Sequence, residues 1–485
     1  MVVLHSISYL LALEGLLMVL CGAASGWVLA DPASAWRPLL GCGGGILLAA
    51  AVLWTATPTR RKITRRDGIA IVAIGWIVAC LLGALPFLLS GTIPGFAAAF
   101  FESSSGLTTT GSTVIPCLEE VPRGILLWRA TSHLLGGLGV LVLLVAILPL
   151  AGAGGSQIVR AEAPSSSGDN RVEPRMTSTA KALWGTYLGL CAVLLILLRG
   201  AGMGWFDATC HAFSAIATGG FSTRTASIGA YASPAIEAIL CIFMVLSALN
   251  FAFHYRALRG DGLPHLRSGE IRFYLGLLVL ALAGTVVALR LFSPAYTAAG
   301  YPHTVRDAAF AVASLATTSG FCTADYGAWP ALAKYILLML FVIGGTTGST
   351  SGGIKAGRIL VLLRAIGTQV RLFLQPAAVL PVRQGRKVVP PAQLLSIATF
   401  VLLFVATILL SALVLLPACP DFVAAASAAA ATVSNTGPGF GAVGPTFSYA
   451  ALPAPALAFL GFLMILGRLE ILTVLALLLP SFWRR

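Results

Sequence analysis

The chain has 485 residues, of which 58% are hydrophobic and only 10% are charged. A typical soluble domain is about 45–50% apolar and about 25% charged, so this composition excludes a soluble enzyme, a disordered chain and a disulfide-rich secreted protein. The net charge is +14, but the Lys and Arg residues lie between hydrophobic segments rather than on a basic face with interleaved aromatic residues. We therefore expect a membrane protein with many spans and no nucleic-acid partner.

Ten stretches are apolar and long enough to cross a bilayer as helices, which takes about 20 residues. They lie near residues 7–30, 38–57, 68–90, 123–150, 179–199, 234–255, 271–292, 330–363, 392–416 and 453–480. Basic residues cluster after every second stretch, near residues 60–66, 160–181, 256–272, 355–387 and 484–485. Because basic loops tend to stay in the cytoplasm, we expect these loops and both termini on the cytoplasmic side.

On the opposite side, four shorter semi-apolar stretches precede loops rich in Gly and Thr. They lie near residues 95–107, 205–217, 305–316 and 421–433. Helices of this length are too short to span a bilayer and suggest re-entrant pore helices, although any one of them alone could be an extracellular amphipathic helix. Four copies at matched positions favour re-entry.

The four loops form an internal repeat with one glycine at the same place in each: Gly111, Gly220, Gly320 and Gly437. The spacings of 109, 100 and 117 residues leave room for two spans and one short helix per repeat. Asp207, Asp307 and Asp421 lie near the expected starts of three short helices, where we expect them to act as caps. The first repeat instead has Glu102 within its short helix.

These patterns predict an all-α integral membrane protein with four repeats of a span (M1), a pore helix and a second span (M2). The repeats are expected in a pseudo-fourfold arrangement, with about ten spans and four re-entrant pore helices in total. We expect a two-helix segment at 1–60, repeats at 61–155 and 156–260, a third with an interrupted M2 helix at 261–375, and a fourth at 376–485.

Four loops around one axis could coordinate an ion. Irregular backbone at membrane depth is stable only where it is buried or lines an aqueous cavity. Backbone carbonyls can replace the hydration shell of an ion, and glycine permits positive φ angles and close approach. Oxygen ligands without fixed charge suit a monovalent alkali cation, and the loops contain no ring of Asp or Glu, which argues against a Ca²⁺ filter.

The loop sequences are Thr-Thr-Gly, Thr-Gly-Gly-Phe, Thr-Ser-Gly-Phe and Asn-Thr-Gly-Pro-Gly. They resemble those of the Trk/Ktr/HKT potassium-uptake superfamily, most closely its bacterial Trk-type membrane subunit. The resemblance covers the chain after residue 60 and implies channel-like K⁺ uptake across the bacterial cytoplasmic (inner) membrane. It implies a K⁺ selectivity filter made by Thr109, Thr110, Gly111, Thr218, Gly219, Gly220, Thr318, Ser319, Gly320, Asn435, Thr436 and Gly437.

The selectivity of such a filter is open on sequence grounds. No loop carries the complete Thr-Val-Gly-Tyr-Gly sequence of tetrameric K⁺ channels. A less selective K⁺/Na⁺ or ammonium pathway, or a cation symporter, is therefore an alternative.

The expected span at 330–363 is interrupted at 344–353 by ten residues that are all Gly, Thr or Ser. Helix propensity is poor there, so we expect a break, although small residues also serve close helix packing. The run lacks the Gly-Lys-Ser/Thr of a phosphate-binding loop. The resemblance implies an intramembrane gate made by Gly345, Thr346, Thr347, Gly348, Ser349, Thr350, Ser351, Gly352, Gly353, Lys355 and Arg468.

Arg468 lies near the middle of the last expected span, where a charge is costly and usually faces a cavity or a partner. It could pair with Glu470, but residues two apart lie on different faces of a helix. The resemblance instead implies that Arg468 reaches the pore beneath the filter and contacts the gating loop. There it could hold the loop closed or oppose the passage of cations.

The sequence contains no nucleotide-binding motif and no His/Cys spacing typical of a metal site. We therefore expect no enzymatic activity, no cofactor on this chain, and K⁺ only as the transported ion. The resemblance implies a homodimer and a cytoplasmic regulatory ring of the RCK type (TrkA-like), with the nucleotide on that partner. The basic loops at 254–272 and 355–387 could dock this ring or contact anionic membrane lipids.

The rival hypothesis is a membrane enzyme or a non-transporting assembly factor. Such a protein would be expected to carry scattered acid and base groups. Here the small polar residues cluster in four equivalent loops instead, which disfavours it.

Overall fold

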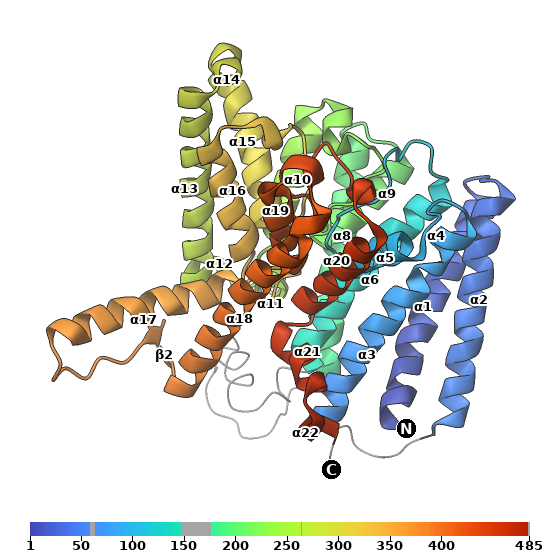
Figure 1. Ribbon diagram of the computed structural model, residues 1–485, viewed down its shortest axis with the longest axis horizontal. Helices are drawn as coiled ribbons and strands as arrows, with labels where there is room; N and C mark the ends of the chain where they lie inside the picture. Colours follow the sequence, from blue (N-terminus) through green and yellow to red (C-terminus); the bar gives the residue numbers. More distant parts are fainter. Residues whose placement is uncertain (59–63, 147–175, 263, 386, 484–485) are drawn as a thin grey trace.

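The computed structural model describes the chain except for residues 59–63, 147–175, 263, 386 and 484–485. Helices dominate the described part, which confirms the predicted helical class. Its strands form one short antiparallel ribbon of β1 (Arg383–Gln384) and β2 (Lys387–Val388), with Arg383 opposite Val388. The first two helices, α1 (Val2–Trp27) and α2 (Ala33–Ala56), form a hairpin at one edge of the molecule (Figure 1, blue).

The two helices of this hairpin approach closely where glycines face each other. A Cβ added to Gly15 would lie 2.9 Å from the carbonyl oxygen of Gly43, and one added to Gly43 would lie 2.8 Å from that of Gly15. Small residues permit such contact between membrane helices, whose association depends on van der Waals packing because lipid tails are as apolar as the side chains. The glycine pair therefore explains why α1 and α2 pack tightly.

After the hairpin, the chain four times runs through a long helix, a shorter helix, an irregular loop and another helix (Figure 1). The first run comprises α3 (Arg65–Gly83), α4 (Leu85–Leu89), α5 (Phe96–Leu107) and α6 (Arg123–Ala146). The second comprises α8 (Met176–Gly200), α9 (Trp205–Ile216), η1 (Ser227–Tyr231), α10 (Pro234–Ser247) and α11 (Phe251–Leu258).

The third run comprises α12 (Pro264–Arg267), α13 (Gly269–Phe292), α14 (Pro294–Ala299), α15 (Tyr301–Ala316), η2 (Tyr326–Ala328), α16 (Ala331–Ile343) and α17 (Ala356–Leu374). The fourth comprises α18 (Pro391–Leu415), η3 (Leu416–Ala418), α19 (Phe422–Val433), η4 (Gly441–Val443), η5 (Tyr449–Ala451), α20 (Ala454–Arg468), α21 (Ile471–Leu478) and α22 (Pro480–Trp483). The four shorter helices α5, α9, α15 and α19 coincide with the four short stretches predicted from the sequence.

Within the described residues, six helical segments are long and apolar enough to cross a membrane, and two bent helix pairs raise the number to eight if each pair is one span. The six involve α1, α2, α3 with α4, α8, α13 and α18. Of the other predicted spans, the one at 123–150 extends past the described end of α6. The one at 330–363 is divided between α16, the irregular loop and α17. The count of ten stays a prediction.

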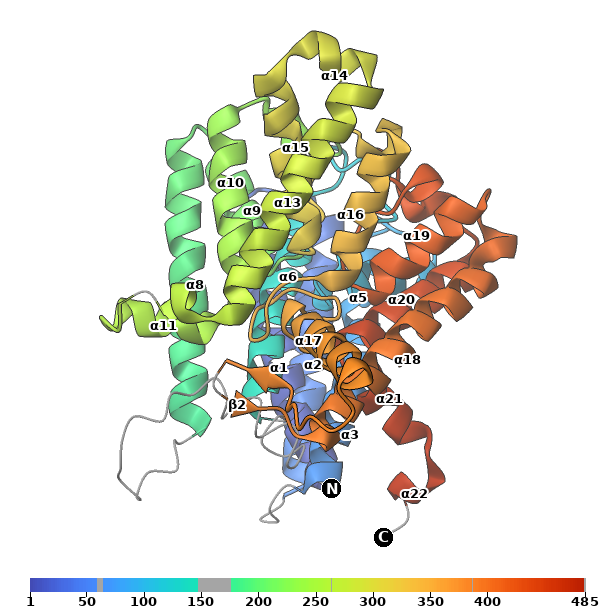
Figure 2. The same cartoon turned by 90° about the vertical axis from the view of Figure 1, so that its left-hand side faces the viewer.

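Two predicted spans are not straight helices, which corrects the expectation of continuous helices at 234–255 and 453–480. The axes of α10 and α11 differ by 101°, and those of α20 and α21 differ by 109°; Figure 2 shows α11 crossing beside the lower part of α8. At the first bend, the side chain of Asn250 accepts a hydrogen bond from the N–H of Ala252 at 2.8 Å and so starts a new helix. At the second, Glu470 has a positive φ of 61°, which ends α20.

The predicted caps differ among the repeats. Asp421 caps α19, where its carboxylate accepts a hydrogen bond from the N–H of Ala424 at 2.7 Å, as expected. Asp207 does not cap α9, because its carboxylate instead accepts from the hydroxyl of Thr223 at 2.7 Å. Asp307 does not cap α15 either, because that helix already begins at Tyr301. The side-chain cap is therefore absent for these two acids, but Asp207 still lies in the first turn of α9, next to the positive end of the helix.

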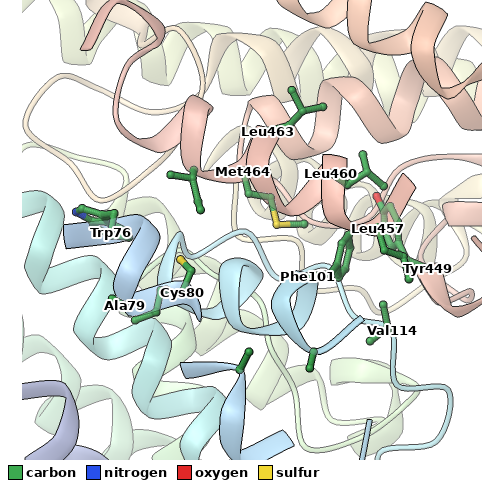
Figure 3. Close-up of a cluster of buried hydrophobic side chains, with 14 of the residues drawn as sticks. Trp76, Ala79, Cys80, Phe101, Val114, Tyr449, Leu457, Leu460, Leu463 and Met464 are labelled. Atoms are coloured by element: carbon green, nitrogen blue, oxygen red, sulfur yellow. The ribbon is translucent and has the colours of Figure 1, made fainter. Parts of the chain in front are cut away.

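The first shorter helix, α5, packs against α20 of the last run, which brings the two ends of the repeat series together. Phe101 of α5 lies 5.1 Å from Tyr449, measured between ring centres. Figure 3 shows Phe101 beside Leu457 and Leu460 of α20, in a hydrophobic core that also contains Met464. This contact places the first and fourth loops side by side.

Candidate functional site

The four Gly/Thr loops share one backbone conformation. The residue two positions before each repeat glycine has a positive φ between 53° and 57°; these residues are Thr109, Thr218, Thr318 and Asn435. The four glycines have φ values between 77° and 99°. Left-handed angles cost a residue such as Thr about 1–3 kcal/mol and persist only where the surroundings impose them. Their recurrence at four matched positions shows that the loops are held in the same shape.

Each loop turns back onto the end of its own short helix. The N–H of the residue before the glycine donates to a carbonyl five residues earlier, at 2.8 Å in all four loops: Thr110 to Ser105, Gly219 to Ser214, Ser319 to Ser314 and Thr436 to Ala431. In two repeats a serine hydroxyl adds a second brace. Ser105 Oγ donates to the carbonyl of Ser112, and Ser314 Oγ donates to that of Phe321, both at 2.6 Å.

Neighbouring loops touch at the glycines. A Cβ added to Gly111 would lie 1.9 Å from the carbonyl oxygen of Gly219, and one added to Gly220 would lie 1.8 Å from that of Ser319. A Cβ added to Gly320 would lie 2.4 Å from the carbonyl oxygen of Thr436, and one added to Gly437 would lie 2.8 Å from that of Thr110. Each time the carbonyl belongs to the residue before the glycine of the next loop, and the fourth loop returns to the first. The contacts therefore close into a ring that a side chain at these positions would disrupt.

One cavity is lined by residues of all four loops. Its lining includes Gly111, Gly220, Gly320 and, beside the fourth glycine, Pro438. The ring contributes backbone carbonyls and hydroxyls, and none of the twelve predicted filter residues carries a charge. Among the described residues, Thr109 Oγ1 and Thr436 Oγ1 are buried without a hydrogen-bond partner. Uncharged oxygens in such a ring suit a partly dehydrated monovalent cation.

The fourth loop departs from the others at Asn435. Its Nδ2 donates to Thr110 Oγ1 of the first loop and to the carbonyl of Met464 in α20, both at 2.9 Å. The side chain therefore braces two neighbours, where Thr109, Thr218 and Thr318 place a hydroxyl. The twelve predicted filter residues come together, but they do not form four identical units.

Arg129 of α6 contacts residues next to both the first and the second loop. The sequence did not predict this contact. Its guanidinium donates to Glu102 at 2.7 Å, to the carbonyl of Ser222 at 3.2 Å and to Thr113 Oγ1 at 3.2 Å. It also lies 3.9 Å from the ring centre of Phe221. The sequence does place both Arg129 and Glu102 inside apolar segments, and charges in such positions usually pair, so this pair could have been suspected.

We expect Arg129→Gln to destabilise the protein by about 3–5 kcal/mol, because it leaves Glu102 buried without its counter-charge. Thermal unfolding of the detergent-purified protein measures the change. Arg224→Gln is the matched control, since Arg224 pairs with Asp207 at 3.3 Å while 46% of its side chain is exposed, and such pairs contribute at most about 1 kcal/mol. Equal small effects of both substitutions would contradict the bracing role.

The Gly/Thr/Ser segment at 344–353 separates α16 from α17, which confirms the predicted helix break, and it lies against three of the four loops. Gly352 donates its N–H to Thr318 Oγ1 at 2.7 Å, and Gly353 donates to the carbonyl of Ser434 at 3.0 Å. Thr350 Oγ1 donates to the carbonyl of Ile216 at 3.0 Å, at the end of α9. The segment is therefore in direct contact with the residues that hold the ring.

Other bonds fasten this segment to the bend between α10 and α11. The N–H of Thr346 donates to the carbonyl of Ala248 at 2.9 Å, and Phe251 donates to the carbonyl of Gly348 at 3.1 Å. Glu270 of α13 accepts a hydrogen bond from the N–H of Thr347 at 2.6 Å. The residues that form these bonds come from distant parts of the chain. The acidic residue Glu270 was the one sign of them in the sequence.

Two cationic side chains converge on residues 349–351. Arg468, the last residue of α20, donates from Nη1 to the carbonyl of Thr350 at 2.8 Å. Its Nε and Nη2 are buried without a hydrogen-bond partner in the described part of the chain. Lys355 donates to the carbonyl of Ser351. Both residues predicted for the gate thus contact the segment.

The alternative pairing of Arg468 with Glu470 does not occur. Glu470 instead forms an ion pair with Arg358 of α17. The break after α20 explains this, because the two residues do not continue along one helix.

Comparison with known proteins gives consistent matches over most of the chain. The family model described as "TrkH: Cation transport protein" matches residues 44–484. The protein named Trk system potassium uptake protein TrkH from Halomonas elongata is 41% identical, over 88% of both chains. Two proteins from Escherichia coli K12 also match: Trk system potassium uptake protein TrkH is 37% identical, and Trk system potassium uptake protein TrkG is 34% identical. They cover 90% and 89% of this chain and 90% and 88% of their own lengths.

A solved structure is similar over the whole length. The crystal structure of the potassium transporter TrkH from Vibrio parahaemolyticus matches with a TM-score of 0.90 and 34% sequence identity. The match covers 100% of this chain and 99% of that one.

Proposed function

The chain belongs to the TrkH family of cation transport proteins, and from this premise we propose that it takes up K⁺ through the ring of four loops. It is a multi-pass membrane transport protein and not an enzyme, as the names of its relatives agree. The membrane potential can drive the uptake, since it contributes about 2.3 kcal/mol per charge for every 100 mV.

The closed ring of glycine-to-carbonyl contacts is the observation that carries this proposal. Four loops with matched positive φ angles contribute residues to the lining of one cavity, and the polar groups of the predicted filter residues are all uncharged. Uncharged oxygens can replace the hydration shell of K⁺ at little cost. The C-terminal ends of α5, α9, α15 and α19 lie just before the loops and add negative partial charge that favours a cation.

The segment at 344–353 is the proposed gate of this pathway. It is bonded to the loop residues Thr318 and Ser434 on one side and to the bend between α10 and α11 on the other. Arg468 and Lys355 hold it with two positive charges. A cation that passed the ring would then meet the peptide segment and these two charges, which supports the proposal that this conformation is the closed one.

A less selective pathway for K⁺ and Na⁺, or for ammonium, is the second candidate. The observation that favours it is Asn435, whose side chain is used to brace its neighbours and so makes the ring unequal. A cation symporter would use the same ring with an additional coupled ion.

We also propose that the protein lies in the bacterial cytoplasmic membrane with both termini in the cytoplasm, as a homodimer with a nucleotide-binding RCK-type ring. The N-terminus and α22, the last described helix, lie toward the same end of the molecule (Figure 1). Helix α17 continues the gate segment directly and carries Arg358, Arg364 and Arg371, so a partner or anionic lipid bound there could act on the gate.

Flux measurements on the purified chain in liposomes test this proposal. We expect K⁺ flux that exceeds Na⁺ flux, and a larger K⁺ flux when the regulatory ring with its nucleotide is added. Empty liposomes and liposomes with heat-unfolded protein are the controls. Equal K⁺ and Na⁺ flux would support the less selective pathway, and no flux of either ion with the ring present would refute a cation pathway.

A further inference from the structure

The N-terminal hairpin contributes one acidic side chain to the interior. Glu14 of α1 is completely buried, and neither of its carboxylate oxygens has a hydrogen-bond partner among the described residues. An ionised carboxylate in an apolar interior is very unfavourable without a partner, so such a group either binds a cation or becomes neutral. The ion pairs of the described residues do not include Glu14.

One hydroxyl lies close to Glu14 in its otherwise apolar surroundings. A Cβ added to Gly83 of α3 would lie 3.2 Å from Glu14 Oε1 and 2.6 Å from Ser103 Oγ of α5. The carboxylate and this hydroxyl therefore flank the same small space, which exists because residue 83 has no side chain. The hydroxyl of Ser103 is also buried without a hydrogen-bond partner in the part of the chain that the structure describes.

Among residues 1–58 and the other described ranges, the titratable groups near Glu14 do not supply a positive charge. Cys80 of α3 interacts with it and is itself a thiol in the hydrophobic core. Glu102 of α5 is turned toward Arg129 and Thr113. From α6, Trp128 donates its Nε1 to the carbonyl of Gly83 at 3.2 Å and brings no charge. From α2, Gly43 packs against Gly15, the neighbour of Glu14, and brings no charge.

We propose that Glu14, together with Ser103 and the space at Gly83, forms a buried proton-binding site behind the first pore helix. A proton converts the carboxylate to a neutral carboxylic acid and so removes the buried charge without a counter-ion. The neutral acid can donate to the Ser103 hydroxyl once the two side chains move together across the space at Gly83. A water molecule or Na⁺ in the same space would use the same oxygens, and the experiment below separates these occupants.

The site is connected to the first loop of the ring. The carbonyl of Ser104 accepts hydrogen bonds from the N–H of Thr108 at 2.9 Å and from its hydroxyl at 2.6 Å. The hydroxyl of Thr108 lies 2.7 Å from that of Thr110, a predicted filter residue. A negative charge on Glu14 would repel the negative C-terminal end of α5. Loss of the proton is therefore expected to disturb the first loop and to lower K⁺ flux; this link, unlike the proton site itself, rests on the proposed function.

Infrared spectroscopy of the purified protein tests the proton site without any transport. At pH 7 we expect a C=O band of a protonated carboxyl group that shifts in D₂O, that is missing from Glu14→Gln and that is displaced in Ser103→Ala. Glu120→Gln, at an exposed position, should retain the band. A wild-type spectrum without the Glu14 band would overturn the proposal. A band that emerges only when Na⁺ is replaced by choline would assign the site to Na⁺ instead, and would equally overturn it.

Flux between pH 7 and about pH 9.5 tests the link to the ring. We expect the wild-type K⁺ flux to fall at least threefold, while Glu14→Gln, which mimics the neutral acid, keeps its flux nearly constant. If the infrared band behaves as expected but the two proteins show the same pH dependence, the proton site stands and its coupling to the ring is refuted. If no variant transports K⁺ even with the regulatory ring and its nucleotide present, while the band behaves as expected, the proposed function fails and the proton site does not.

Discussion

Gly220→Ala should lower K⁺ flux in liposomes at least tenfold and reduce the preference for K⁺ over Na⁺. The added Cβ would lie 1.8 Å from the carbonyl oxygen of Ser319, in the neighbouring loop. No side-chain rotation can relieve a clash with backbone, so one of the two loops must move. Because selectivity depends on the positions of the carbonyls, a displacement of this size changes both the rate and the ion preference.

The matched control for this substitution is Gly202→Ala. Gly202 also has a positive φ, of 100°, but a Cβ there would meet nothing within 4 Å. Both variants therefore carry the cost of a left-handed alanine, and only Gly220→Ala disturbs the ring. If Gly220→Ala transports K⁺ with the rate and selectivity of the control, the ring is not the permeation pathway.

Arg468→Ala should raise the K⁺ flux of the protein in the absence of its regulatory partner by roughly tenfold. Arg468 donates to the carbonyl of Thr350 in the gate segment, and a hydrogen bond of a charged group contributes about 1.5–3 kcal/mol. If this bond forms only while the gate is closed, losing it increases the open population by at least about tenfold, since 1.4 kcal/mol corresponds to a factor of ten. The measurement is the initial rate of ⁸⁶Rb⁺ or K⁺ uptake at equal protein content.

Two further variants show whether the bond or the charge is responsible. Arg199→Ala removes an exposed arginine near the end of α8 and should leave the flux unchanged. Arg468→Lys keeps the positive charge with a different donor geometry. Flux as low as wild type in Arg468→Lys would assign the effect to the charge, and raised flux would assign it to the bond. Wild-type flux in Arg468→Ala, with a normal amount of protein, would exclude both roles.

The local pattern of the sequence predicted the four short helices closely. The stretches expected at 95–107, 205–217 and 421–433 correspond to α5, α9 and α19 with end positions that differ by one residue at most. Their ends were predictable because a Gly/Thr-rich loop follows each one, and such residues do not continue a helix. The third, α15, starts four residues earlier than the expected 305, because Tyr301 and Pro302 form an additional first turn.

The long-range partners of charged residues could not be predicted in the same way. Arg468 was expected to contact the gate only through a family resemblance, and Glu470, two residues away, pairs with Arg358. Arg129 bonds to the carbonyl of Ser222 and to Glu102, each in another helix or loop. A span pattern shows that a buried charge needs a partner, but it does not show which helix faces it.

The sequence by itself therefore determined the helical class, the membrane location, the position of each short helix and the four glycines that lie at the ring. These follow from hydropathy, from spacing and from backbone preferences, which act within a few neighbouring residues. Only the tertiary structure decided that the glycines abut the carbonyls of the next loop, that Arg129 braces two loops, and that Glu14 lies unpartnered beside Ser103. These contacts join residues that are far apart in the chain, and they depend on how each helix is rotated about its own axis. A hydrophobic stretch of nearly uniform composition does not encode this rotation locally.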